Sequence, residues 1–198
     1  KSNDPARARD VMAALVAGGL PVIEVVLRTP RAFEVVETLA AQGGPAIVGV
    51  GTVLGEEHAR RALEAGARFL VSPGLDDGVV RVASDAGVPV LPGVATATEA
   101  QRAWNMGLRH VKFFPAKQAG GVPMLKALAS VFSDLRFMPT GGVGPGNLAE
   151  FLGVSSVLAC GGSWLTPADA VKSDNDAAIT QLAEEALNIA RGVRNPLD

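Results

Sequence analysis

A lysine interrupts an apolar, aromatic run that has the composition of a buried strand. Lys112 lies in segment 109–115, which reads RHVKFFP. Side chains alternate along a strand, so Lys112 and Phe114 are expected on the same face. An amine held among apolar groups has a lowered pKa, which suits it to form a Schiff base with a carbonyl substrate. The run also fits a lysine that extends from a strand end into solvent, and the segment alone favours neither interpretation.

Two further charges occur in an apolar strand-like segment near the N-terminus. Segment 21–28 reads PVIEVVLR, and alternation puts Glu24 and Arg28 on one face while the other face is entirely aliphatic. We expect the aliphatic face to pack against helices and the charged face to point inward. The two charges are too far apart along a strand to pair with each other, so Lys112 is the natural partner of Glu24. A charge network that only fills the interior is the alternative.

Strand-like runs recur along the chain at intervals of about 20 to 26 residues, the length of a strand, a helix and two short loops. Alternation of strand and helix with this period predicts a parallel sheet of βα units. The apolar runs are 22–27, 46–50, 68–71, 88–91, 110–114, 136–138 and 156–160.

Helix signals separate these runs. Asp4-Pro5 and Thr29-Pro30 each combine a capping residue with a proline suited to the first helical turn, and Thr96 with Glu99 has capping-box spacing. The segment 174–193 has the pattern of a long amphipathic helix. Glycines that end helices are expected at 18–19, 43–44, 66, 87 and 107.

The element order predicts a (β/α)8 barrel in one domain over residues 1–198. The chain begins at Lys1 with a helix, whereas a closed barrel needs one more strand upstream. We therefore expect a first strand that is missing from the given sequence. An open doubly wound sheet is the alternative, although no G-x-G-x-x-G segment supports a dinucleotide site.

The composition of the chain argues against several classes of partner and site. The 198 residues are 48% hydrophobic and 19% charged, with a net charge of −2, as expected of a globular domain. No basic cluster, membrane-spanning stretch or signal peptide is present, so we expect neither a nucleic acid nor a membrane partner. The one cysteine, Cys160, fits a buried thiol in a reducing cytoplasm. With two histidines and one cysteine, we expect no metal site.

Glycine-rich turns follow the last two strand-like runs. Gly141-Gly142 and Gly162-Ser163 precede the helix-start signals at 144–145 and 166–167. Backbone N–H groups and helix N-termini suit a phosphate, and the loops after the seventh and eighth strands are the usual phosphate site of a barrel. The sequence therefore predicts a phosphate site at these turns, at the end of the barrel where active sites lie.

The order of the motifs resembles that of the class I aldolase family that contains 2-keto-3-deoxy-6-phosphogluconate and 4-hydroxy-2-oxoglutarate aldolases. The resemblance covers residues 13–170, and only the family's first strand lacks a counterpart. The matching segments are IEVVLRT at 23–29, VGVGTV at 48–53, VSPG at 71–74, KFFPA at 112–116, PTGG at 139–142 and GGSWL at 161–165.

The resemblance implies a role for each candidate residue. Lys112 would be the Schiff-base lysine and Glu24 the general acid and base. Arg28 would hold the pyruvate carboxylate, with the Thr52 hydroxyl at the same end of the substrate. Pro73 and Phe114 would form the apolar wall of the pocket, although ordinary packing is their alternative. Gly141, Gly142, Gly162 and Ser163 would contact the phosphate.

The resemblance further implies a cytoplasmic homotrimer of the Entner–Doudoroff pathway that needs no cofactor or metal. It would cleave 2-keto-3-deoxy-6-phosphogluconate to pyruvate and D-glyceraldehyde 3-phosphate. The alternatives within the family are a 4-hydroxy-2-oxoglutarate aldolase and a 2-keto-3-deoxy-6-phosphogalactonate aldolase. Outside it, a phosphosugar isomerase or epimerase and a non-catalytic barrel that binds a phosphorylated ligand also fit. Lys117, beyond the strand in a polar loop, is expected in solvent.

Overall fold

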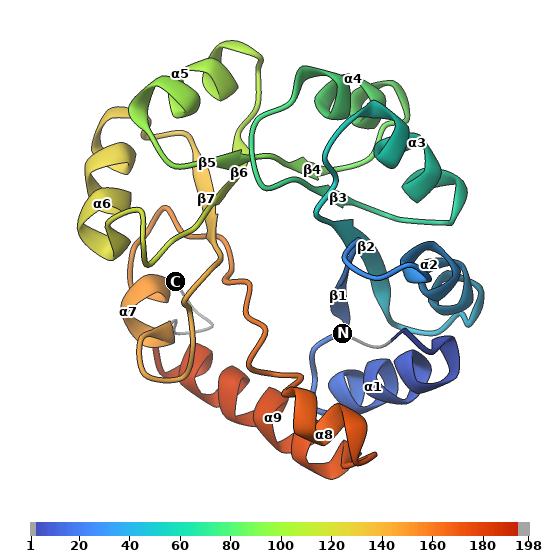
Figure 1. The fold of residues 1–198 in the computed structure, drawn as a ribbon. Coiled ribbons are helices and arrows are strands. Elements are labelled where there is room, and N and C mark those ends of the chain that lie inside the picture. The colour runs from blue at the N-terminus through green and yellow to red at the C-terminus, as the bar shows by residue number, and fades with distance from the viewer. Residues whose placement is uncertain (1–2, 194–198) are drawn as a thin grey trace.

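Parallel strands and helices alternate along the chain, as the sequence predicts. The computed structural model describes residues 3–193, so residues 1, 2 and 194–198 of the expected domain lie outside the described residues. Figure 1 shows the strands around a central axis with the helices outside them. The strands are β1 (Val22–Val26), β2 (Ile47–Gly51), β3 (Leu70–Val71), β4 (Val90–Leu91), β5 (Gly93–Val94), β6 (His110–Phe113) and β7 (Arg136–Pro139).

The helices follow most of the predicted signals. The Asp4 side chain accepts a hydrogen bond from the Ala6 amide at the start of α1, and Thr96 and Glu99 form the capping box of α5. The start predicted at Thr29-Pro30 was wrong: α2 begins two residues after Pro30, because residues 29–32 form a turn first. The helices are α1 (Pro5–Ala17), α2 (Ala32–Ala41), α3 (Glu56–Glu64), α4 (Asp77–Asp85), α5 (Ala97–Asn105), α6 (Gly121–Val131), α7 (Leu148–Leu152), α8 (Ala168–Lys172) and α9 (Asp176–Val193).

The strands lie side by side in chain order. Strands β1 to β4 form one parallel sheet and β5 to β7 another. Pro92 separates β4 from β5, and its carbonyl accepts a hydrogen bond of 2.9 Å from the Lys112 amide of β6. The two sheets are therefore continuous through Pro92. A doubly wound sheet reverses its strand order at a switch point. No reversal occurs among the described strands, so that alternative is wrong.

The last predicted strand, 156–160, is not a regular strand. It pairs with β7 only through two isolated bridges, Phe137 with Val157 and Thr140 with Gly161. No strand of residues 3–193 lies on its other side, between it and β1. Within residues 3–193 its strand pairing is therefore with β7, and Leu158 is 48% exposed.

The two faces of each strand have different surroundings, which fixes the direction of the charged residues. Ile23 and Val25 of β1 pack into a cluster with α2 and α3, and Phe113 and Phe137 pack into a cluster with α5, α6 and α7. Glu24 and Lys112, which alternate with these residues, are left on the inner face. Cys160 is half-buried, not buried as predicted. No helix within residues 3–193 is both long and apolar enough to span a bilayer.

Candidate active site

Lys112 is buried on a strand in the interior, so the solvent-exposed alternative is wrong. Its residue exposure is 5%, and its neighbours across the sheet are Gly93 of β5 and Met138 of β7. The Lys112 Nζ lies 4.9 Å from the centre of the Phe114 ring, on the face that the two residues were predicted to share. Burial lowers the pKa of the Lys112 amine, Glu24 opposes that shift, and Arg28 adds to it. The site therefore shifts the amine toward its neutral, nucleophilic form.

Glu24 reaches the same interior from β1. Burial raises the pKa of its carboxyl group, and the positive charges of Lys112 and Arg28 act in the opposite direction. Glu24 and Lys112 influence each other electrostatically, yet no ion pair joins these two described side chains. Burial thus moves both groups toward their neutral forms, which suits a pair that exchanges protons with a substrate between them.

Two glycines of β2 make room for the interior side chains. A Cβ built on Gly51 would lie 1.7 Å from the Glu24 Oε1, so the carboxylate occupies the space that any larger residue would fill. A Cβ on Gly49 would lie 2.3 Å from the Phe69 ring. Neither glycine was predicted as a site residue. The sequence pattern does indicate them, because Gly49 and Gly51 alternate with Val48 and Val50 and so share the inner face.

Arg28 and Thr52 meet just beyond the ends of β1 and β2. The Arg28 Nε donates a hydrogen bond of 3.4 Å to the Thr52 hydroxyl, at an exposed position. Thr52 has a φ of 63°, a left-handed conformation that is strained for a β-branched residue. Such strain is found at functional sites, where the surrounding structure maintains it. The structure thus brings the predicted carboxylate clamp and its hydroxyl partner together.

Pro73 lies beside the residue that pairs with Lys112, and the Phe114 ring faces the Lys112 amine. The Pro73 carbonyl oxygen would lie 2.0 Å from a Cβ on Gly93, the residue paired with Lys112. The Phe114 ring lies below the Lys112 amine on one side and would lie 3.3 Å from a Cβ on Gly141 on the other. Phe114 therefore connects the lysine to the first of the predicted phosphate turns.

The two glycine turns are adjacent, because Thr140 and Gly161 form a parallel bridge. Gly141 and Gly142 both have positive φ values, 95° and 79°, and the Trp164 ring packs on Gly162 where a Cβ would be. Within the described chain, the amides of Gly142, Gly162 and Ser163 donate no backbone hydrogen bond. These amides can therefore bind an anion.

Of the two helix starts predicted at these turns, the first needs correction. Helix α7 begins at Leu148 and not at Pro145, and the Asn147 side chain bonds Gly144 and Gly142 of the preceding loop instead of capping the helix. Helix α8 begins at Ala168, directly after Pro167. Each helix has five residues, so the dipole at its N-terminus is weak. An anion here would depend on loop amides and side-chain charge.

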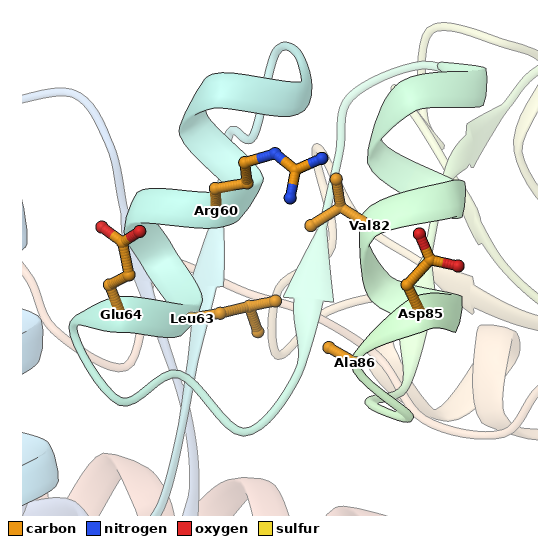
Figure 2. Close-up of a pocket in the computed structure, with 6 residues that line it drawn as sticks. All are labelled: Arg60, Leu63, Glu64, Val82, Asp85 and Ala86. Atoms are coloured by element: carbon orange, nitrogen blue, oxygen red, sulfur yellow. The ribbon is translucent and has the colours of Figure 1, made fainter.

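A separate pocket lies on the outer surface, between α3 and α4 (Figure 2). Its lining contains none of the predicted site residues and combines three charged with three apolar side chains. Among residues 3–193 no group of three metal-ligating side chains converges. The pocket is lined by Arg60, Leu63, Glu64, Val82, Asp85 and Ala86.

Comparison with known sequences determines the family. The sequence profile described as "Aldolase: KDPG and KHG aldolase" matches residues 1–182. The chain belongs to this family. KDPG is 2-keto-3-deoxy-6-phosphogluconate, and KHG is 4-hydroxy-2-oxoglutarate. The chain is 45% identical over 178 residues to the KHG/KDPG aldolase of Escherichia coli K12, an alignment that covers 90% of this chain and 84% of that protein.

Solved structures of the KDPG and KHG aldolase family have the same fold. The KDPG aldolase of Zymomonas mobilis ZM4, solved with 3-phosphoglycerate, is 44% identical, with a TM-score of 0.88 over 96% of this chain and 89% of that one. The KDPG aldolase of Legionella pneumophila, solved with pyruvate captured as a covalent carbinolamine, is 39% identical. Its TM-score is 0.90 over 92% of this chain and 89% of that one. The protein is therefore an aldolase, a lyase with the strand and helix arrangement of a (β/α)8-type barrel.

Proposed function

We propose that this aldolase cleaves KDPG to pyruvate and D-glyceraldehyde 3-phosphate through a Schiff base on Lys112. The observation that carries the proposal is the buried amine of Lys112, whose pKa is lowered and which shares the interior with Glu24. Relatives named as KDPG aldolases support the substrate. The carbinolamine captured with pyruvate in the Legionella aldolase supports covalent chemistry on an amine.

The proposed reaction begins at the neutral Lys112 amine, which attacks the C2 carbonyl of the keto acid to form a carbinolamine. Glu24, whose raised pKa lets it carry a proton, protonates the departing hydroxyl so that water leaves and an iminium forms. Glu24 then accepts the proton of the C4 hydroxyl as the C3–C4 bond breaks and its electrons move to the iminium. Glyceraldehyde 3-phosphate leaves, and protonation and hydrolysis of the enamine release pyruvate and the free lysine.

The two ends of the substrate would be held by different groups. Arg28 suits the carboxylate, because a guanidinium can form two parallel hydrogen bonds to it, and Thr52 already orients that guanidinium. Pro73 and Phe114 would form the apolar wall beside C3. At the far end, the amides of Gly141, Gly142, Gly162 and Ser163 would receive the phosphate. The free amides of these turns favour a phosphorylated substrate over 4-hydroxy-2-oxoglutarate.

The test is pyruvate release measured with three substrates: KDPG, its galactonate epimer and 4-hydroxy-2-oxoglutarate. We expect the highest kcat/KM with KDPG and no turnover by Lys112→Met. Preference for 4-hydroxy-2-oxoglutarate would contradict the phosphate assignment, and preference for the epimer would contradict the gluconate series. An active Lys112→Met variant would contradict the mechanism.

We further propose a cytoplasmic homotrimer that acts in the Entner–Doudoroff pathway, as the resemblance to the family implies. Light scattering after size exclusion should give three times the chain mass of 20.3 kDa. A monomer mass at assay concentration would contradict the trimer. The location and the pathway are tested by fractionation of the source cells and by growth on gluconate after deletion of the gene.

A further inference from the structure

Lys117 is held against one of the two glycine turns. It lies in the turn that follows β6, and its amide donates a hydrogen bond of 2.9 Å to the Gly141 carbonyl. A Cβ built on Gly142 would lie 2.5 Å from the Lys117 Cβ, 3.3 Å from its Cγ and 3.1 Å from its Cδ. The methylene stem of the lysine therefore runs along the α-carbon of Gly142. Glycine at 142 permits both the positive φ and this close approach.

The ammonium of Lys117 has no counter-ion among the described residues. The side chain is exposed and forms no ion pair with residues 3–193, although many surface arginines of the same chain do. The paired arginines are Arg31, Arg60, Arg81, Arg102 and Arg109. A fixed stem with an unpaired charge leaves the ammonium available to an external anion.

The turns themselves lack positive charge. Segments 139–147 and 160–167 contain no lysine or arginine, and the five-residue helices α7 and α8 provide only weak dipoles. Amides alone would face a phosphate that carries nearly two negative charges at neutral pH. A cation beside Gly142 supplies the missing charge, and its hydrogen bonds to phosphate would be charge-assisted.

We infer that Lys117 is a specificity-determining residue, whose ammonium binds the phosphate of the substrate beside the Gly142 amide. This inference rests on the proposed cleavage of KDPG. Lys117 acts on recognition of the phosphorylated end and takes no part in Schiff-base chemistry at Lys112. Its presence makes the enzyme discriminate between phosphorylated and unphosphorylated keto acids more strongly than the glycine turns alone would.

The test compares Lys117→Gln with Lys117→Arg and with Lys126→Gln, a matched loss of one exposed lysine on α6. Each variant is assayed with KDPG and with unphosphorylated 2-keto-3-deoxygluconate. We expect Lys117→Gln to lose about fivefold to thirtyfold in kcat/KM for KDPG, mostly through KM, because an exposed contact to a charged group is worth a kcal/mol or two. The unphosphorylated substrate should be handled as by the wild type. Lys117→Arg should retain most of the discrimination, and Lys126→Gln all of it.

Failure of the role proposed for Lys117 and failure of the proposed function give different results. If the wild type prefers KDPG and Lys117→Gln keeps that preference, the role of Lys117 is refuted while the proposed function stands. If the wild type shows no preference for the phosphorylated substrate, the phosphate assignment fails first. An equal loss on both substrates would indicate that Lys117 only supports the fold of the turn, and this too refutes the inference. Inhibition by inorganic phosphate gives a second readout, since its inhibition constant should rise in Lys117→Gln alone.

Discussion

Replacement of Gly51 by alanine should abolish most activity while leaving the fold intact. The added Cβ would lie 1.7 Å from the Glu24 Oε1, 2.5 Å from its Cδ and 2.8 Å from its Cγ. All three atoms belong to the outer part of one flexible side chain, so Glu24 can rotate away without displacing the backbone. The substitution therefore moves the proposed proton carrier and little else.

The expected loss of stability in Gly51→Ala is much smaller than the expected loss of activity. Overpacking in a core costs about 1–3 kcal/mol, and removal of a glycine from the unfolded chain offsets about 0.4–1 kcal/mol of it. We expect a Tm change of a few degrees, since about 1 kcal/mol shifts a domain of this size by about 2–4 °C. Loss of a positioned acid and base lowers the rate by about 10²–10⁴-fold. Activity should therefore fall far more than the population of folded enzyme.

The assay is kcat/KM for KDPG alongside calorimetric Tm. Gly55→Ala is the matched control, because no atom lies within 4 Å of a Cβ built there. Gly51→Ala should also have almost no further effect in a Glu24→Ala background, where the space is vacant and the acid is already lost. Unchanged kcat/KM in Gly51→Ala, or an equal effect of it with and without Glu24, would refute the assignment of Glu24.

The remaining predictions concern the same interior groups. Burial raises the pKa of Glu24 in the folded state, so Glu24→Gln should stabilise the fold at neutral pH, and the gain should disappear as the pH falls through the folded pKa to the unfolded value. Burial lowers the pKa of Lys112, so Lys112→Met should stabilise the fold at neutral pH, and this gain should vanish as the pH rises to the ordinary lysine value. Denaturation as a function of pH checks both, and an opposite slope would contradict the burial argument. Thr52→Gly should relieve the strain at a φ of 63° and raise Tm by about 2–4 °C. It should also raise KM for pyruvate in the condensation direction about twofold to tenfold, because Arg28 loses its hydroxyl partner; a lower Tm would indicate that the strain is not relieved.

Alternation along strands was enough to predict which charged residues point inward. Lys112 and Glu24 occupy the interior because their neighbours are aliphatic or aromatic and need the helical face. The capping box of Thr96 and the N-cap of Asp4 were also predictable, since both depend on residues only two or three positions apart. Local patterns thus account for the elements and for the direction of the site residues.

Contacts between distant segments were not predictable in the same way. The space that Gly51 leaves for Glu24 depends on the register of β1 against β2. The run 156–160 has strand composition, but a regular strand needs pairing that its sequence does not encode. The position of Asn147 in the sequence suits either a cap of α7 or a bond to the preceding loop. No spacing rule separates these two possibilities, and the side chain bonds the loop. The first two features depend on a partner from elsewhere in the fold, whereas Asn147 bonds local partners three and five residues away.

The proposed mechanism depends on a Schiff base between Lys112 and the keto acid. The most direct measurement is borohydride reduction of the enzyme in the presence of pyruvate, followed by peptide mass spectrometry. We expect a stable adduct with the mass of reduced pyruvate on the peptide that contains Lys112, and none in Lys112→Met. An adduct on another lysine, or an adduct of equal yield in Lys112→Met, would contradict this mechanism.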